Sequence, residues 1–371
     1  MSKRFKNRKI VLKKTAAKPD WLLVALILGL TVFGVVMVGN ASVAEAYRDF
    51  GDNLYFLRLQ AQWAGLGCFA FFVASVFNHR RLKILAAPLM FFTILALGAV
   101  LIPGLGIEAF GARRWLGVGR VRFQPAELAK FAFVFYLAAF LSNKRKILPF
   151  LLVMALLVFL IMLQPDLGTM VIVVTSGLMV YFASGASVLI MAVIGFLGLL
   201  SGVGLIYFSS YRRQRLLTFL NPSHDPLGTS YHIRQVLIAL GSGGLFGLGL
   251  GQSRQKYEYL PMVATDSIFA IIAEETGFVG GGLLLLAFLV FIWRVFKIAK
   301  TVADPFSQLL ATGITAWIGL QALVNLAAMV ALVPLTGVPL PFISYGGSSL
   351  ILTLTGSGIL VNISKFRVVK K

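Results

Sequence analysis

Ten long apolar runs occupy most of this 371-residue chain, and they limit its fold more than any other feature. Each run is about 17 to 25 residues long, enough to cross roughly 30 Å of hydrocarbon as a helix. Lipid offers no hydrogen bonds to the backbone, so such runs must be helical inside a membrane. We therefore predict an all-α integral membrane protein, a single bundle of about ten transmembrane helices at 21–39, 54–77, 84–102, 126–142, 147–163, 168–183, 187–208, 267–293, 306–333 and 348–363.

The distribution of Lys and Arg predicts how this bundle is oriented. Ten crossings place both termini on one side of the membrane, and short loops rich in Lys and Arg face the cytoplasm. Twenty-one of the 34 Lys and Arg residues lie in five segments, 1–20, 79–83, 143–146, 293–300 and 364–371. We predict a basic cytoplasmic tail at 1–20, a membrane domain at 21–365 and a basic cytoplasmic tail at 366–371. Orientation and contact with anionic membrane lipids explain the net charge of +21, so nucleic-acid binding is not expected.

Three connections are longer than the others, and this topology places all three on the outer side: 40–53, 103–125 and 209–265. Long connections in compact proteins are often functional. The third is a large outer loop between spans 7 and 8, and its segments YRRQRLLTFL and YHIRQVLIAL are apolar enough on one side to form helices at the membrane surface. It continues as GSGGLFGLGLG. Because no βαβ unit surrounds these glycines, they indicate a tight turn more than a nucleotide site, while close approach of the backbone to a ligand stays open.

Arginines on the outer side break the expected charge bias. That side should be poor in Arg, yet GARRWLGVGRVRF and YRRQR carry several. The planar guanidinium binds phosphate and carboxylate groups, so a group of arginines beside the bilayer suits a lipid-linked phosphate or pyrophosphate. The alternative is that these side chains reach lipid headgroups or outer acids. We predict substrate-binding roles for Arg113, Arg114, Arg120, Arg122, Arg212 and Arg213.

Ionisable side chains in or beside the spans are costly and are often functional. Glu127 and Lys130 are three residues apart on one side of a helix, which fits either function or a self-neutralising pair. Asp166 lies in QPDLGT, a turn in which Asp is also favoured by turn chemistry. Asp266 either caps the helix that follows the large loop or acts chemically. Glu274 follows about two turns later on roughly the same face.

The absence of other motifs narrows the available chemistry. The three histidines make no metal-ligand spacing, and the chain has no Walker sequence, no G-x-S-x-G elbow and no HExxH. What is left is carboxylate and guanidinium. Removal of a proton from a hydroxyl group beside a bound phosphate fits that inventory.

Five segments, taken together, resemble the SEDS family of shape, elongation, division and sporulation proteins. They are GARRWLGVGRVRFQPAELAKF, QPDLGT, NPSHDPLGTSYHIRQVLIALGSGGLFGLGLGQSRQKYEYLP, TDSIFAIIAEETGFVG and PLTGVPLPFISYGGSS. They occur in the family's order, and the resemblance covers nearly the whole chain. The stretch GLGLGQSRQKYEYLP is more similar to the division members than to the elongation members.

The resemblance implies a ten-span peptidoglycan glycosyltransferase in the bacterial cytoplasmic membrane. Such an enzyme polymerises lipid II into undecaprenyl-pyrophosphate-linked glycan on the outer face, beside a class B penicillin-binding transpeptidase of the division or elongation machinery. Asp266 would be the essential general base, with Glu127 and Lys130 in the catalytic set. Asp166 and Glu274 would join the arginines in binding substrate. The implied mechanism accepts a divalent cation, Mg²⁺ or Mn²⁺, without requiring one, and no metal ligands are predicted.

Departures from the family and two rival functions remain. Family members commonly carry His two residues before the key Asp, where this chain has Ala264, so an imidazole at that position is not required here. The Glu that usually stands before the family's histidine is absent from PMVA. A lipid II flippase is one rival, because transporters also bury ionisable residues and broken helices near the midplane. A non-catalytic scaffold for a transpeptidase is the other. The clustering of the charged candidates at the outer edge favours the enzyme.

Overall fold

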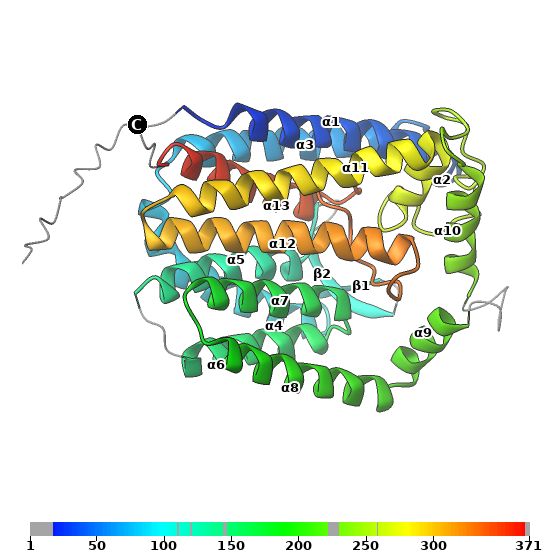
Figure 1. The fold of residues 1–371 in the computed structure, drawn as a ribbon. Helices are drawn as coiled ribbons and strands as arrows, with labels where there is room; N and C mark the ends of the chain where they lie inside the picture. The colour runs from blue at the N-terminus through cyan, green and yellow to red at the C-terminus, as the bar shows by residue number, and fades with distance from the viewer. Residues whose placement is uncertain are drawn as a thin grey trace, which may run out of the picture.

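The computed structural model describes residues 18–109, 111–118, 121–143, 147–221, 230–257 and 259–367. Its long helices run side by side as one bundle (Figure 1). Each predicted span coincides with one of them. They are α1 (Trp21–Ala41), α3 (Tyr55–Val76), α4 (Ala86–Leu101), α5 (Pro125–Leu141), α6 (Ile147–Met162), α7 (Leu167–Ala183), α8 (Val188–Tyr207), α11 (Ile268–Thr301), α12 (Pro305–Met329) and α13 (Gly347–Ser364).

Length and composition fit these helices to a membrane. Among the described residues, six helices are long and apolar enough to cross one: α1, α3, α4 with the preceding 3₁₀ turn η1 (Arg81–Leu85), α11, α12 and α13. Shorter apolar helices are α6, α7 and Val188–Gly204 of α8. Apolar side chains cover the outside of the bundle, for example Phe69, Phe92 and Phe196, which suits contact with lipid. The predicted helical membrane bundle is therefore confirmed.

Polar contacts gather both described ends of the chain at one end of the bundle, here called the terminal end. Asp20 caps α1 by accepting from the Leu23 N–H at 3.2 Å, and its backbone N–H donates to Ser364 Oγ at 3.0 Å. Its carboxylate also pairs with Arg294 at 2.9 Å and Arg367 at 3.0 Å. These contacts join three of the segments predicted to share one side of the membrane.

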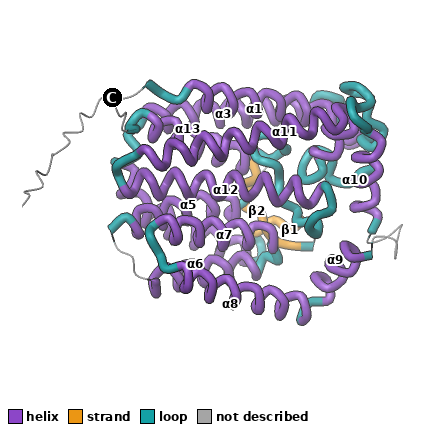
Figure 2. Tube along the Cα trace, viewed as in Figure 1, coloured by secondary structure: helices purple, strands orange, loops and turns teal. Residues whose placement is uncertain are grey.

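The remaining elements gather at the opposite end, here called the sheet end (Figure 2). Three antiparallel strands in the order β1–β2–β3 form a small sheet from β1 (Gly106–Ala109), β2 (Ala112–Val118) and β3 (Val121–Phe123). The helices α2 (Val43–Phe50), α9 (Ser210–Leu220) and α10 (Tyr231–Ser242) lie around it. The two helices predicted in the large loop are confirmed as α9 and α10. The prediction of a purely α-helical chain missed the sheet.

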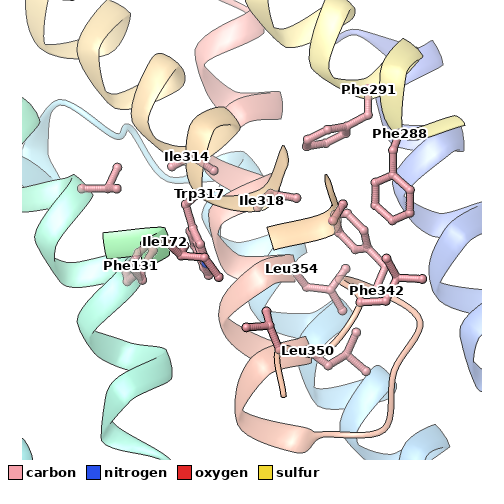
Figure 3. Close-up of a cluster of buried hydrophobic side chains, with 14 of the residues drawn as sticks. Phe131, Ile172, Phe288, Phe291, Ile314, Trp317, Ile318, Phe342, Leu350 and Leu354 are labelled. Carbon is pink, nitrogen blue, oxygen red and sulfur yellow. The ribbon is translucent and has the colours of Figure 1, made fainter. Parts of the chain in front are cut away.

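Helix α12 forms the centre of the bundle and contacts α5, α7, α10, α11 and α13. Trp317, Ile314 and Ile318 from α12 lie in one apolar cluster with Phe131 of α5 (Figure 3). The same cluster continues through α7, α11, α13 and the connection before α13, with Ile172, Phe288, Phe291, Phe342, Leu350 and Leu354. Because α12 is packed on nearly all sides, polar groups along it act on buried parts of the protein and not on lipid.

Helix α11 is broken at Gly277, where φ is 68° and ψ is −168°. The glycine-rich segment 243–249 repairs the break. The N–H groups of Leu248 and Gly249 donate to the carbonyls of Glu274 and Glu275 at 3.0 Å. In return the carbonyls of Gly244 and Leu245 accept from the N–H groups of residues 278 and 279, at 2.9 and 3.1 Å. The GxGxG run therefore lies against helix backbone, which is the physical reason for its glycines.

Candidate active site

Asp266 lies at the sheet end, two residues before α11 begins. Its side chain faces a cavity of about 320 Å³. Ser267, not Asp266, holds the cap position of α11, so the interpretation of Asp266 as a helix cap is wrong. Within the described residues, no hydrogen bond or ion pair engages the Asp266 carboxylate. The cavity lining comes from α9, α10, α12 and the connections beside them: Gln214, Arg215, Thr218, Phe219, His232, Ile233, Met262, Asp266, Met329, Leu335 and Gly337.

The electrostatic setting of Asp266 suits a base. Burial raises the pKa of Asp266 from its ordinary 3.8 to about 6, and the nearby carboxylate of Asp166 adds to the rise. The guanidinium groups of Arg215 and Arg114 oppose it. These three side chains are thus the charged groups that act on Asp266. A carboxyl group with this pKa is mostly ionised at neutral pH, yet it binds a proton more readily than an exposed Asp does.

Asp166 and Arg114 come together at the turn that leads into α7. Asp166 caps α7, because its carboxylate accepts from the Thr169 N–H at 2.9 Å and from Thr169 Oγ1 at 2.8 Å. Arg114 extends from β2 and donates from Nε to the carbonyl of Gln164 and from Nη2 to that of Pro165, both at 2.8 Å. The sheet thereby fixes a guanidinium group beside Asp166. Its two hydrogen-bond acceptors are neutral carbonyls, so they do not cancel the positive charge that Arg114 directs at Asp266.

Helices α9 and α10 supply the other side of the cavity. Arg215 donates from Nη1 to the carbonyl of Leu335 at 3.1 Å. His232 Nε2 lies 2.7 Å from Ser267 Oγ. Burial and the neighbouring Arg215 lower the pKa of His232 to about 4, so its ring is neutral near pH 7. Arg215 and His232 were not among the predicted site residues.

The other predicted arginines lie in different surroundings. Arg113 is half-exposed on β2, and its Nε lies 3.5 Å from Glu108 Oε2, which is the pairing with an outer acid that the sequence left open. Arg122 and Arg213 are exposed and do not line the cavity. Arg120 and the side chain of Arg212 lie outside the described residues. Of the six predicted arginines, Arg114 is thus the one that the described structure brings to Asp266.

Glu127 and Lys130 form a buried pair on α5 and are not part of the cavity lining. Lys130 Nζ lies 2.7 Å from Glu127 Oε1 and 2.7 Å from Gln321 Oε1 of α12. The Lys130 side chain has no exposed surface. The self-neutralising arrangement is therefore present, and the pair reaches other parts of the protein only through its neighbours.

Glu274 is also buried away from the cavity lining. It accepts hydrogen bonds from the backbone N–H of Arg254 at 3.1 Å, from that of Gln255 at 3.4 Å, and from the hydroxyl of Ser253. Its neighbour Glu275 pairs with Lys256 at 3.2 Å. Both acids fasten the segment 251–257 to the first half of α11. This gives a structural reason for two carboxylates inside an apolar helix.

Fold and site together define a multi-pass membrane protein that holds a carboxylate and two guanidinium groups at one end of its helical bundle. The chain belongs to the FtsW/RodA/SpoVE family, whose model, described as "Cell cycle protein", matches residues 20–368. The resemblance to SEDS proteins is therefore confirmed.

Individual relatives match over nearly their whole length. The stage V sporulation protein E of Bacillus subtilis (strain 168) is 42% identical over 362 residues, covering 95% of this chain and 98% of that protein. A protein of Trichlorobacter lovleyi named probable peptidoglycan glycosyltransferase FtsW is 37% identical, covering 94% of this chain and 93% of its own.

Solved structures give the same result for the fold. A chain of a peptidoglycan synthase complex, from a study of how polymerization and crosslinking are coordinated, superposes with a TM-score of 0.76 at 31% identity, covering 93% of this chain and 97% of its own. The rod shape determining protein RodA of Thermus thermophilus superposes with a TM-score of 0.69 at 31% identity, covering 95% of this chain and 98% of its own.

Proposed function

We propose that this chain is a peptidoglycan glycosyltransferase that polymerises lipid II during cell division. The observation that carries the proposal is the Asp266 carboxylate, which lines a cavity together with Arg215 and makes no hydrogen bond or ion pair with a described residue. The charges of Arg215 and Arg114 act on it through space. A base and fixed positive charge are what a sugar transfer with a pyrophosphate leaving group needs. The names of the relatives support the same reaction class.

The proposed reaction is one inverting displacement. Asp266 takes the proton from the 4-hydroxyl of the acceptor N-acetylglucosamine while that oxygen attacks the anomeric carbon of the growing chain. The bond between this carbon and the pyrophosphate oxygen breaks, and undecaprenyl pyrophosphate leaves. Arg114 and Arg215 stabilise the charge that develops on the pyrophosphate. No covalent intermediate with the protein is needed.

In this proposal the sheet end faces outward and both termini are cytoplasmic. Support comes from the terminal end, where the basic segments around Arg294 and Arg367 meet Asp20 at the start of α1. The partner is a class B penicillin-binding transpeptidase, which the structural neighbour from a synthase complex supports. A transpeptidase beside the sheet end would crosslink strands as they are made.

A divalent cation would depend on the substrate for most of its ligands. Within the described residues, no group of three or more His, Cys, Asp or Glu could hold a metal ion. Mg²⁺ in phosphate-transfer sites is commonly held by one or two carboxylates together with the substrate phosphates. A Mg²⁺ or Mn²⁺ ion bound to the pyrophosphate would find Asp166 as the carboxylate beside Asp266.

The broken helix α11 favours one rival, a lipid II flippase, because discontinuous helices are typical of transporters. Purified protein in vesicles with fluorescent lipid II separates the two functions when polymer and transbilayer movement are measured together. Polymer without movement supports the glycosyltransferase, and movement without polymer supports the flippase. If neither occurs but the transpeptidase partner is activated, the chain is a scaffold.

The polymerisation rate is expected to rise about tenfold between pH 5 and pH 7 and then to level off. A general base works only when ionised, and the pKa of Asp266 is about 6, so the ionised fraction grows through this interval. Initial rates measured at constant ionic strength check the midpoint. A midpoint near pH 4, typical of an exposed Asp, would show that Asp266 does not control the rate.

The substitution Arg215→Gln is expected to lower kcat/KM for lipid II by about 10- to 100-fold, the usual value of one charge-assisted hydrogen bond. Both side chains are exposed, but Arg215 lines the cavity and Arg213, two residues away on α9, does not. Arg213→Gln is therefore the matched control and should stay within about twofold of wild type. Equal losses in both variants would mean that the charge of α9 matters only for its general attraction to the membrane or substrate.

A further inference from the structure

The backbone that carries Asp266 is held at three successive carbonyl groups. The carbonyl of Ala264 accepts from the N–H of Tyr345 at 2.8 Å, and that of Thr265 accepts from Ser344 Oγ at 2.6 Å. The carbonyl of Asp266 itself accepts from Asn325 Nδ2 at 2.9 Å. The side chain of Asp266 is unengaged among the described residues, while its main chain is fixed on one side.

Two amides on one face of α12 hold the partner segment in turn. Asn325 Nδ2 also donates to the carbonyl of Val338 at 2.8 Å. One turn earlier, Gln321 Nε2 donates to the carbonyl of Pro339 at 3.0 Å. Gly337 lies next in this segment, and a Cβ atom built there would come within 3.5 Å of Asp266 Oδ2. The two amides therefore set where the segment 337–345 meets Asp266.

The buried pair on α5 fixes the orientation of the Gln321 amide. Gln321 Oε1 accepts from Lys130 Nζ at 2.7 Å and from Trp317 Nε1 at 3.0 Å. Both partners are donors only, so they must face the oxygen of the amide, and Nε2 must then point to Pro339. Glu127 Oε1 holds Lys130 Nζ in place at 2.7 Å. Glu127 Oε2 and Asn325 Oδ1 have no hydrogen-bond partner among the described residues. The Gln321 amide, which is bonded at both its oxygen and its nitrogen, is therefore the member of this network that is held in a single orientation.

We propose that Gln321 and Asn325 are positioning residues for Asp266, and that Glu127 and Lys130 act on the reaction through them without touching substrate. This inference rests on the proposed function, because it assigns the geometry of the proposed base. It also gives the Glu127–Lys130 pair a role that agrees with its burial. A base must be held to within a fraction of an ångström of its productive position. A displacement of 1 Å can cost about 100-fold in rate.

The test compares Asn325→Ala with Asn362→Ala in the full-length protein with its transpeptidase partner. Asn362 is the matched control because it is equally buried and donates to the Ser75 carbonyl at 2.8 Å, but lies at the terminal end. Asn325→Ala strands the carbonyls of Asp266 and Val338. Asn362→Ala strands the backbone N–H and the ring of His79, which contact Asn362 Oδ1, while the Ser75 carbonyl keeps Lys365. Each variant therefore leaves two buried polar groups without this partner, and both should lower the melting temperature by similar amounts. Only Asn325→Ala is expected to lower kcat, by about 10- to 100-fold, with KM for lipid II changed less than about threefold.

The pH dependence of kcat gives a second readout, which would not change if Asn325 had only a structural role. Among the described residues, the charged groups acting on Asp266 are Asp166, Arg114 and Arg215, and His232 also lines the cavity. The Asn325 change alters none of them. A loosened Asp266 should be better hydrated, so the acid limb of kcat should move to lower pH by about half a unit or more. The double variant Glu127→Gln, Lys130→Met leaves no stranded charge and should shift the limb in the same direction.

Three outcomes would overturn the inference. The first is equal kcat in the Asn325 and Asn362 variants. The second is an Asn325→Ala variant in which only KM changes. The third is a double variant that raises KM at constant kcat, which would mean that Lys130 binds the substrate phosphate. The Asp266→Asn variant separates this failure from that of the proposed function. If Asp266→Asn retains activity, Asp266 is not the base. If it is inactive while Asn325→Ala matches its control, only the positioning inference fails.

Discussion

Replacing Asp266 with Asn is expected to lower the rate of glycan polymerisation by about 10³-fold, a typical loss for a general base. Asn keeps the size and polarity of the side chain but cannot accept the proton of the attacking hydroxyl. Within the described residues the Asp266 carboxylate holds no partner, so its loss breaks no bond in the fold. The measurement is the initial rate of lipid II polymerisation by the purified complex, compared between wild type and variant.

Thermal unfolding provides the control for this variant, and the direction of the expected change in melting temperature follows from the pKa of Asp266. The pKa of Asp266 is raised in the folded protein, so its ionisation destabilises the fold as pH rises from about 4 through 6. Asp266→Asn removes that cost and should melt higher than wild type at pH 7.5, with no gain below pH 4. An inactive variant that melts higher is a folded protein that lacks its base. Retained polymerisation at wild-type rate would remove Asp266 from the mechanism.

Membrane architecture was the part of this protein that could be predicted most directly from sequence, because the bilayer constrains each span separately. A run such as 21–39 needs no knowledge of its neighbours to be identified as helix, and the observed α1 spans Trp21–Ala41. The surface helices α9 and α10 could be predicted for the same reason, since their apolar faces are local patterns. The sheet could not, because GARRWLGVGRVRF has no clear alternation and its strands form by pairing with one another.

The residues that form the site are far apart in the sequence and come together only through tertiary contacts. Asp166 acts on Asp266 across 100 residues of sequence because α7 and α11 both begin at the sheet end. In YRRQR, adjacent arginines point about 100° apart around the helix, so only docking decides which one faces the cavity. Among the described side chains that residue is Arg215, which shares a face with Phe219 one turn later. The apolar residues of α9 could have indicated this face.

The sequence located the buried charged residues correctly, but it did not identify the groups that bind them. From the sequence, Glu274 was expected to bind substrate. Instead the backbone and hydroxyl donors of residues 253–255 satisfy it, and these belong to a segment whose path no local pattern reveals. Lys130 was expected near the substrate, yet its Nζ bonds to Gln321 on another helix. Carboxylates enter this apolar helix because a loop that folds against the helix offers them hydrogen bonds.

The break in α11 leads to the second large effect, which concerns stability. Gly277→Ala is expected to destabilise the protein by about 3 kcal/mol or more, because the backbone there has a conformation that side chains rarely adopt. A Cβ atom would also collide with the backbone of Leu245 and Gly247, which repair the break. The strain cannot be relieved locally, since the hydrogen bonds between 243–249 and α11 fix both sides. The measurement is the melting temperature and the yield of monodisperse protein in detergent.

Gly282→Ala is the matched control on the same helix. A Cβ at Gly282 meets nothing within 4 Å, and its backbone is helical, so this variant should be neutral or more stable by up to about 1 kcal/mol. If the two variants melted alike, the segment 243–249 would be free to move away from α11. The backbone carbonyls of Glu274 and Glu275 would then lose the N–H donors of Leu248 and Gly249. A large difference in melting temperature between the two variants would instead show that the glycine-rich segment 243–249 and the broken helix α11 fold as one unit.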